Sequence, residues 1–323
     1  MKQEHVEQYS KAIAAVAAKE VKNIYFVACG GSKAFMHPAQ YICDLETETP
    51  SAVYPSNEFV HRCPKGLGKN SVVITCSHSG NTPETVKATE LAREKGALTI
   101  ALSNLVDSPL WKTAEYAIHY DWKDFDFSDG RYGMLYAVTF GILNVLAPCE
   151  KYDRAIKAVS ALQPAIDRAH VQHKERADVF GKTHKRDKLI YTMASGSNYG
   201  SAYSFAICLL MEMSWVNSNA IHAGEYFHGP FECTDFDVPF LLLKGIDQCR
   251  PLDERAEAFC KKYSERVTVI DAAEFDLHEV PADLQCYFAA VVTDCVLRDY
   301  ADALADHRGH PLSVRRYMWR MEY

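Results

Sequence analysis

Apolar and polar positions follow two patterns in turn along the first 150 residues. Short apolar runs bounded by polar or glycine residues are typical of buried strands, and they occupy residues 23–28, 51–54, 71–76, 98–102 and the stretch around Ile118. In residues 1–22 apolar side chains recur about every 3.6 residues, which indicates an amphipathic helix. A further helix is expected to begin at Pro83. Strands that alternate with helices in this way predict a doubly wound α/β domain with a parallel sheet.

The same pattern starts again near Leu189. Residues 131–180 look helical, first apolar and then charged from Tyr152 onward, and the polar run 181–188 is expected to lead into a second domain. Strands are then expected at 189–193, 239–243 and 267–270, with a helix between the last two. We therefore expect one domain at 1–150, a helical connection at 151–185 and a second domain at 186–323 that ends in a tail.

Small-residue loops follow three of the expected strands. They are Cys29-Gly30-Gly31-Ser32, Ser77-His78-Ser79-Gly80-Asn81-Thr82 and Ser195-Gly196-Ser197. Backbone N–H groups and hydroxyls between a parallel strand and a helix are suited to an anion such as phosphate. The alternative is capping of the helix by one hydroxyl. Because residues 77–82 hold three hydroxyls and a cap needs one, we favour phosphate binding there.

A compact group of chemically active residues lies between 202 and 235. Residues 202–215 are apolar with helical character and carry one carboxylate, Glu212. The turn that follows contains Glu225 and then His228-Gly229-Pro230. A carboxylate on an apolar helix and a histidine in a glycine-proline turn are suited to proton transfer. The alternative is structural: Glu212 caps or salt-bridges its helix, and His228 packs in its turn.

Composition excludes several classes of function. The chain has 323 residues, is 48% hydrophobic and has a formal net charge of −7, so no basic face for nucleic acid is expected. The first residues are polar and no apolar run reaches membrane-spanning length, so we expect neither a signal peptide nor a membrane partner. The eleven cysteines are scattered, without a C-x-x-C pair. They predict buried free thiols in a cytoplasmic protein rather than disulfides or a metal site.

Three motifs together resemble tandem sugar isomerase (SIS) domain proteins. They are the loop Cys29-Gly30-Gly31-Ser32, the loop Ser77-His78-Ser79-Gly80-Asn81-Thr82 and the turn Gly224-Glu225-x-x-His228-Gly229-Pro230. The resemblance covers essentially the full chain and is closer still to the fructosamine-6-phosphate deglycases. Residues 25–32, the stretch 221–231 and the tail Arg315-Arg316-Tyr317-Met318-Trp319 are most similar to the members of that family that act on 6-phosphofructose-aspartate, in bacterial use of fructose-asparagine.

The resemblance implies a fold and a set of site residues. The fold is two SIS domains, each a five-stranded parallel sheet flanked by helices in a flavodoxin-like order. The substrate's phosphate and sugar would be bound by Gly31, Ser32, Ser77, His78, Ser79, Thr82, Ser195 and Ser197. Glu212 would move the proton between C1 and C2. His228 would open the sugar ring and, as in relatives, act across the interface of a homodimer. Glu225 would orient the turn that carries His228 or itself be the acid.

The resemblance also implies an activity. The enzyme would cleave a 6-phosphofructosyl amino acid, an Amadori product, to glucose 6-phosphate and the free amino acid, with no metal or organic cofactor. Two alternatives stay open: an aldose–ketose or amino-sugar phosphate isomerase that uses the same residues, and a non-catalytic sensor of sugar phosphates. The tail departs from the isomerase relatives, because they have a lysine near the ketose where this chain has Arg315, Arg316 and Arg320. From sequence, the tail either covers the site or docks on the surface.

Overall fold

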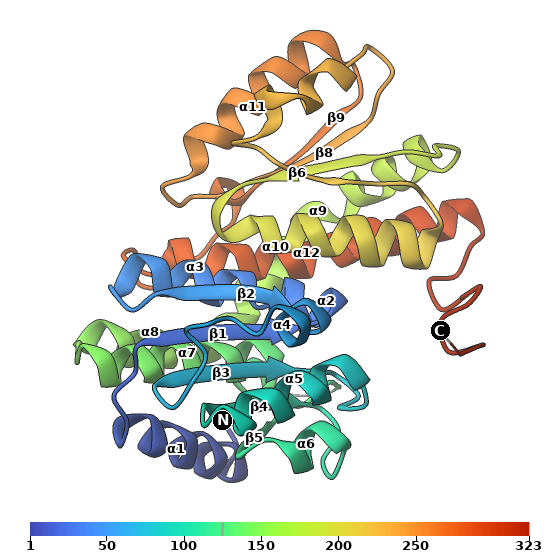
Figure 1. The fold of residues 1–323 in the computed structure, drawn as a ribbon. Coiled ribbons are helices and arrows are strands. Elements are labelled where there is room, and N and C mark those ends of the chain that lie inside the picture. The colour runs from blue at the N-terminus through green and yellow to red at the C-terminus, as the bar shows by residue number, and fades with distance from the viewer. Residues whose placement is uncertain (124–125, 323) are drawn as a thin grey trace. The chain divides into compact units, whose positions relative to one another are not determined.

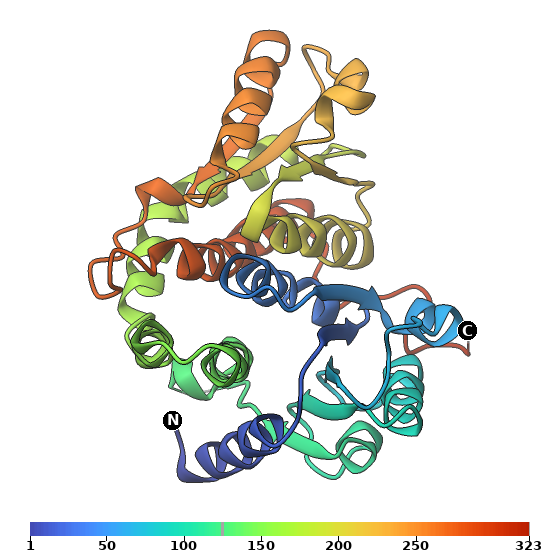
Figure 2. The same ribbon diagram turned by 60° about the vertical axis from the view of Figure 1, so that its left-hand side comes forward.

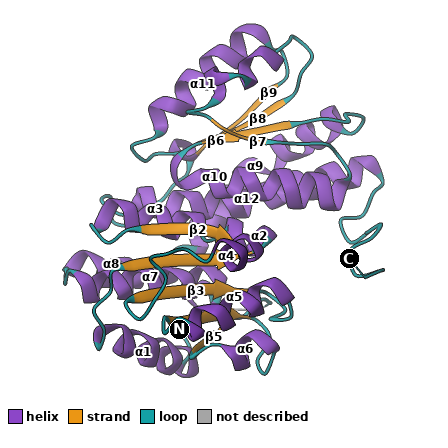
Figure 3. Ribbon diagram, in the orientation of Figure 1, coloured by secondary structure: helices purple, strands orange, loops and turns teal. Residues whose placement is uncertain are grey.

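The computed structural model describes residues 1–123 and 126–322. These residues form two compact units, unit 1 at Met1–Gln163 and unit 2 at Pro164–Tyr323. Strands and helices alternate along most of both units, as Figure 3 shows by colour.

Unit 1 is built on a sheet of five parallel strands in the order β2-β1-β3-β4-β5 (Figure 1). The central strands β1, β3 and β4 are mostly apolar and almost entirely buried, as is typical of parallel sheets covered on both faces. The order is the flavodoxin-like winding expected from the sequence, which is confirmed for this unit. The strands are β1 (Asn23–Ala28), β2 (Ser51–Pro55), β3 (Ser71–Cys76), β4 (Leu98–Ser103) and β5 (Tyr116–His119).

The helices of unit 1 cover its sheet. Phe59 from α4 and Ala88 from α5 pack against Tyr25, Val27 and Val73 of the sheet. The apolar helix α7 is buried over most of its length and contacts α1, α3 and α8. The helices are α1 (Gln3–Ala17), α2 (Gly30–Ala34), α3 (His37–Glu46), α4 (Ser56–Arg62), α5 (Pro83–Glu94), α6 (Pro109–Thr113), α7 (Arg131–Leu146) and α8 (Glu150–Ser160).

Unit 2 has a smaller sheet of four parallel strands in the order β7-β6-β8-β9. The expectation of five strands in each sheet is therefore corrected for the described part of this unit. Strand β7 is three residues long and lies in a stretch that reads from sequence as a polar turn, so its pairing with β6 is a tertiary effect. The strands are β6 (Tyr191–Ala194), β7 (Ala220–His222), β8 (Phe240–Lys244) and β9 (Val267–Asp271).

Helices lie on both faces of the second sheet. Helix α11 covers one face, and α9, α10 and α12 lie on the other (Figures 1 and 2). His173 of α9 is hydrogen-bonded to Tyr300 of α12 at 3.0 Å, which fixes these two long helices side by side. The helices are α9 (Gln163–His184), α10 (Tyr199–Ser204), the π-helix Phe205–Ser214, α11 (Arg250–Tyr263) and α12 (Gln285–Arg308), and the short 3₁₀ turns include Tyr226–His228 and Pro230–Cys233.

One expectation about the middle of the chain is wrong. The charged stretch after Tyr152 is two helices, because α8 ends at Ser160 and α9 begins at Gln163 with Pro164 in its first turn. Helix α9 continues through His184, so the first half of the polar run 181–188 is helical. The polar side chains there belong to a helix with one exposed face, which composition alone does not separate from a loop.

The repeat of the α/β pattern in the two units is also visible in the backbone. Gly30 and Gly196, in the loops after β1 and β6, have the same left-handed φ of 53°. This conformation favours glycine because a side chain would strain it. The strand orders 2-1-3-4 and 7-6-8-9 also correspond. The loops at these two positions are therefore equivalent in fold, and their contacts can be compared directly.

Within the described residues, no helix is both long enough and apolar enough to cross a membrane.

Candidate active site

The loop after β3 presents hydroxyls that do not cap the helix behind it. Helix α5 begins at Pro83 and has no hydrogen bond from a side-chain cap. Instead the hydroxyls of Ser77 and Thr82 are hydrogen-bonded to each other at 2.8 Å, and the Ser79 hydroxyl accepts a hydrogen bond from the Asn81 N–H at 3.2 Å. The capping alternative weighed from the sequence therefore does not hold here.

Backbone N–H groups complete this loop. The N–H groups of His78, Ser79 and Thr82 donate to no acceptor among the residues that the structure describes. They lie at the carboxyl end of β3 and before the first turn of a twelve-residue helix, whose dipole favours negative charge. The arrangement is suited to a phosphate group.

A cation beside this loop was missed by the sequence reasoning. Arg131 begins α7, and its guanidinium lies 5.8 Å from the centre of the Trp122 ring, which in turn lies 4.5 Å from the His78 ring. Burial and the charge of Arg131 both lower the pKa of His78, so that its imidazole is neutral at pH 7. The only local signal was an arginine at the start of an apolar helix, and that gives no distance to residue 78.

The loop after β1 is narrower. Gly30 has a left-handed φ, and Gly31 and Ser32 lie in the short helix α2. Burial raises the pKa of Cys76, the last residue of β3, to about 12, and the nearby Ser32 hydroxyl acts in the opposite direction, so the thiol is neutral. The loop after β1 therefore lies close to the end of β3, from which the loop with Ser77 starts.

The equivalent loop of unit 2 is filled by the protein's own carboxylates. Ser195 donates its hydroxyl to Asp253 at 2.6 Å. Ser197 donates both its hydroxyl, at 2.6 Å, and its backbone N–H, at 3.1 Å, to Asp247. Both serines are buried and their donors are already paired within the protein, so the assignment of Ser195 and Ser197 to substrate stays a prediction. The residues that pair with them lie 58 and 50 positions further on, and no local pattern in the sequence indicates these pairings.

The pKa of Asp253 reflects the burial of this loop and the second carboxylate nearby. Its pKa is raised to about 6, first by burial and further by the nearby Asp247, against hydrogen bonds from Ser195 and from the Gly245 N–H. Two carboxylates thus occupy the position that an anionic ligand would take. Unit 2 keeps the left-handed glycine of the loop after β1, but in unit 2 the protein's own carboxylates accept from the hydroxyls of that loop.

Glu212 lies in the last turn of the π-helix and is ion-paired with the tail. The Oε1 atom of Glu212 accepts from Nε of Arg315 at 3.0 Å and lies 2.8 Å from its Nη2. The ion pair foreseen by the structural alternative is therefore present. The other oxygen, Oε2, has no partner among the described residues. Arg315 thus holds the carboxylate in place and leaves Oε2 unpaired in the part of the chain that the structure describes. π-Helical turns of this kind are frequent at functional sites.

A cavity of about 800 Å³ lies at this end of the π-helix, where the C-terminal tail folds over it. Of the two possibilities left open for the tail, covering the site is the one that fits its contact with Glu212. The lining residues are Met211, Glu212, Trp215, Val216, Asn217, Arg315, Arg316, Tyr317, Met318 and Met321.

His228 ends a 3₁₀ turn, and its side chain is exposed. The ring has no hydrogen-bond partner among the described residues, so it does not pack in the turn as the structural alternative required. Gly229 follows with a φ of 138°, which only glycine adopts readily, and turns the chain sharply behind the histidine. Glu225 contributes its backbone carbonyl, which accepts from the His228 N–H at 2.9 Å, and no hydrogen bond or ion pair joins its exposed carboxylate to the His228 ring.

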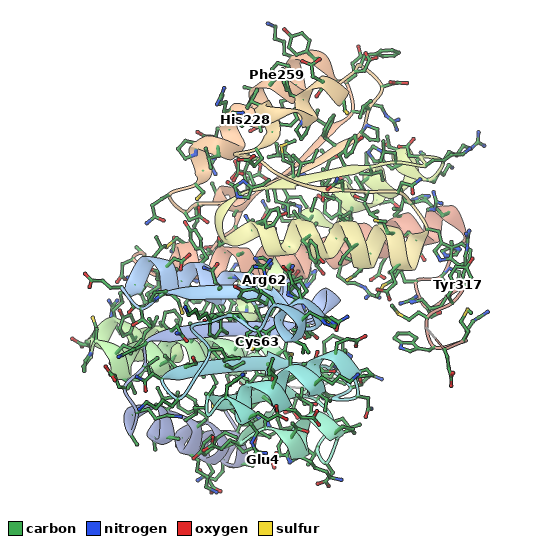
Figure 4. All side chains as sticks on the ribbon, viewed as in Figure 1. Glu4, Arg62, Cys63, His228, Phe259 and Tyr317 are labelled. Carbon is green, nitrogen blue, oxygen red and sulfur yellow. The ribbon has the colours of Figure 1, made fainter. Side chains whose placement is uncertain are left out.

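Glu212 and His228 lie at opposite ends of the parallel strands of the second sheet. Strand β6 leads into α10 and the π-helix, which returns the chain to the amino ends of the strands before the parallel strand β7 begins. Glu212 comes just before β7 and His228 just after it. A strand of five residues such as β8 spans roughly 16 Å, which sets the scale of their separation. Figure 4 shows His228 beside Phe259 of α11, and Tyr317, on the tail that covers Glu212, on the other side of the unit.

The known relatives of this chain define its family. Residues 19–126 match the family model of the SIS domain, which defines the chain as a SIS-domain protein. Over 94% of both chains the sequence is 51% identical to the fructosamine deglycase FrlB of Bacillus subtilis. It is 31% identical to the fructoselysine 6-phosphate deglycase of Escherichia coli, over 85% of this chain and 84% of that one. The chain belongs to the fructosamine deglycase family.

A solved structure shows the same fold over the full length. A Bacillus subtilis protein described as a candidate phosphosugar isomerase matches with a TM-score of 0.96 and 48% identity, and all of both chains is covered. The expectations of a SIS fold and of an enzyme of the deglycase family are therefore confirmed.

Proposed function

We propose that this protein cleaves 6-phosphofructosyl amino acids to glucose 6-phosphate and the free amino acid, with aspartate as the amino acid. The observation that carries this proposal is the cavity of about 800 Å³ beside Glu212, which the tail covers. A ketose phosphate has nothing larger than a hydroxyl at C1, so an isomerase needs no such space. A fructosyl amino acid carries its amino-acid portion at that carbon. The family's named deglycase relatives support the same reading.

The reaction begins with ring opening, which we assign to His228. Glu212 then removes a proton from C1 with Oε2, the electron pair of the C1–H bond forms the C1–C2 double bond, and the C2 oxygen gains a proton. The resulting enaminol is protonated at C2, which gives an imine between C1 and the amino-acid nitrogen. Water adds to C1, the C1–N bond breaks and the amino acid leaves. The loop Ser77–Thr82 binds the phosphate at O6 throughout, and its negative charge is favoured there by N–H groups and the dipole of α5.

We propose further that the active enzyme is a homodimer. Glu212 and His228 act on atoms a few bonds apart in one sugar. They lie, however, at opposite ends of the strands, which a strand length of roughly 16 Å separates. We infer that the two residues reach one substrate from different copies of the chain. A twofold dimer solves this, because the same interface then supplies His228 from a second copy to each Glu212. The free thiols of all eleven cysteines support a reducing compartment, for which we propose the cytoplasm.

The decisive experiment compares products. Purified protein is incubated with 6-phosphofructosyl derivatives of aspartate, lysine and glycine, and both glucose 6-phosphate and the free amino acid are measured. A deglycase releases the two in equal amounts, fastest from the aspartate derivative. Glu212→Gln is the matched control for contaminating activity. Interconversion of sugar phosphates without release of amine would establish the isomerase alternative, and binding without turnover of any substrate would establish the sensor.

A further inference from the structure

The cavity beside Glu212 has apolar walls and a basic edge. Trp215, Tyr317, Met318 and Met321 supply aromatic and thioether surface, and Arg315 and Arg316 supply positive charge. Ligand sites commonly combine a large apolar lining with a few charged groups that fix orientation. The two arginines of the tail differ in what they contact.

Arg315 is already neutralised. It pairs with Glu212 and donates Nη1 to the carbonyl oxygens of Leu312 and Val314, at 2.6 Å and 3.0 Å. Its side chain is buried, with 8% of its surface exposed. These contacts fix the guanidinium and leave its charge balanced by one carboxylate. Arg315 therefore positions Glu212 and is not the group that gives the cavity a net charge.

Arg316 has no such partner. Its guanidinium lies 4.0 Å from the centre of the Trp215 ring, and it forms no ion pair or hydrogen bond with the described residues. Among the residues that line the cavity, Glu212 and Arg315 cancel, and Arg316 leaves one positive charge. Its planar guanidinium is shaped to accept a carboxylate through two parallel hydrogen bonds.

The backbone at Trp215 is consistent with a built site. Trp215 ends the π-helix in a left-handed conformation, with φ 54° and ψ 38°, which is strained for a large side chain. Its indole lies under Arg316 and 4.4 Å from the ring of His310. Strained residues persist where surrounding contacts hold them, and they cluster at ligand sites. The strain places the aromatic surface that supports the Arg316 cation at the cavity.

We infer that Arg316 binds a carboxylate of the substrate's amino-acid portion and thereby selects fructosyl amino acids over fructosyl amines without a carboxylate. This inference rests on the proposed function, because it places the amino acid beside the carboxylate that acts at C1. The phosphate at O6 has its own donors in the loop Ser77–Thr82, so the charge of Arg316 is available for the other end of the substrate.

The test compares three substrates that differ in their carboxylates: the 6-phosphofructosyl derivatives of methylamine, glycine and aspartate, which have none, one and two. Arg316→Gln should lower kcat/KM about 10–100-fold where the contacted carboxylate is present, the range for losing a hydrogen bond to a charged group. The loss on the methylamine derivative should be less than about twofold. A loss on glycine and aspartate assigns the contact to the α-carboxylate, and a loss on aspartate alone assigns it to the side chain. Both support the inference.

Arg320→Gln is the matched control, because Arg320 is exposed on the same tail and does not line the cavity. It removes the same charge and should leave the ratio of the three substrates unchanged. An equal loss on all three substrates in Arg316→Gln, or no loss on any, overturns the inference while the proposed function stands. A change of sedimentation coefficient in Arg316→Gln would assign the cavity to contact between subunits and would also overturn it. If the wild-type protein releases amine from none of the three, the proposed function fails, and this inference fails with it.

Discussion

A mixture of two inactive variants, Glu212→Gln and His228→Asn, should recover about a quarter of wild-type activity. The expectation follows from the second sheet, because the two residues lie at opposite ends of its strands. If each site takes Glu212 from one copy and His228 from the other, a mixed dimer contains one site with both substitutions and one intact site. Equal amounts that associate at random give half mixed dimers, and each has one working site of two, which makes about one quarter overall.

The background should be low enough to see this gain. Loss of a general acid or base typically costs about 10²–10⁴-fold, so each variant alone should have at most about 1% of wild-type activity. Differently tagged copies are dissociated, mixed and reassociated, and the mixed dimer is isolated through both tags before glucose 6-phosphate release is measured. Melting temperatures of the single variants should equal that of the wild type, which separates lost chemistry from lost folding.

A double variant, Glu212→Gln with His228→Asn, sharpens the result when it is mixed with wild-type protein. Sites shared between copies leave about a quarter of the activity of the same total amount of wild-type protein, because mixed dimers then have no complete site. Sites contained in one chain leave about half. If the isolated mixed dimer of the two single variants has only background activity, the shared site is refuted. The inference from the positions of Glu212 and His228 at opposite strand ends is then refuted too.

Three other predictions concern separate parts of the molecule. Ser77→Ala should raise KM about tenfold or more and change kcat little, because it removes a donor to a phosphate that does not react; a normal KM with a collapsed kcat would contradict the phosphate assignment. Glu212→Gln should bind substrate and fail to exchange the C1 protons with deuterated water, and exchange at the wild-type rate, followed by NMR, would exclude Glu212 as the base. His173 is fully buried beside Tyr300 and its pKa is lowered from 6.5 to about 4 by burial, so the unfolded chain binds the proton more tightly. The free energy of unfolding should therefore be highest above pH 6.5 and fall, because of this histidine, by up to about 3 kcal/mol between pH 6.5 and 4. In urea titrations at both pH values, the free energy of unfolding of His173→Gln should fall by correspondingly less.

Local sequence determined the elements that carry the loops expected to bind phosphate. The strands β1, β3 and β4 are short apolar runs buried on both faces, and the loops that follow β1 and β3 contain the glycine and hydroxyl residues that their conformations need. These choices depend on neighbours a few positions away, so hydrophobic pattern and turn chemistry predict them. The strand β7 and the break between α8 and α9 were not predicted, because three polar-flanked residues or a short gap between helices give little periodic signal.

Tertiary structure decided which of the predicted site residues are available to a ligand. Ser197 and Ser79 both follow strands in loops rich in small residues, but Ser197 is occupied by Asp247, fifty positions away. Glu212 is held by Arg315, which lies 103 positions further on. Such pairings depend on how the chain returns in space, and no local pattern records them. The sequence determined which groups could bind an anion or move a proton, and the fold determined which of them are free, because a donor or a charge satisfied by the protein itself has no capacity left for a substrate.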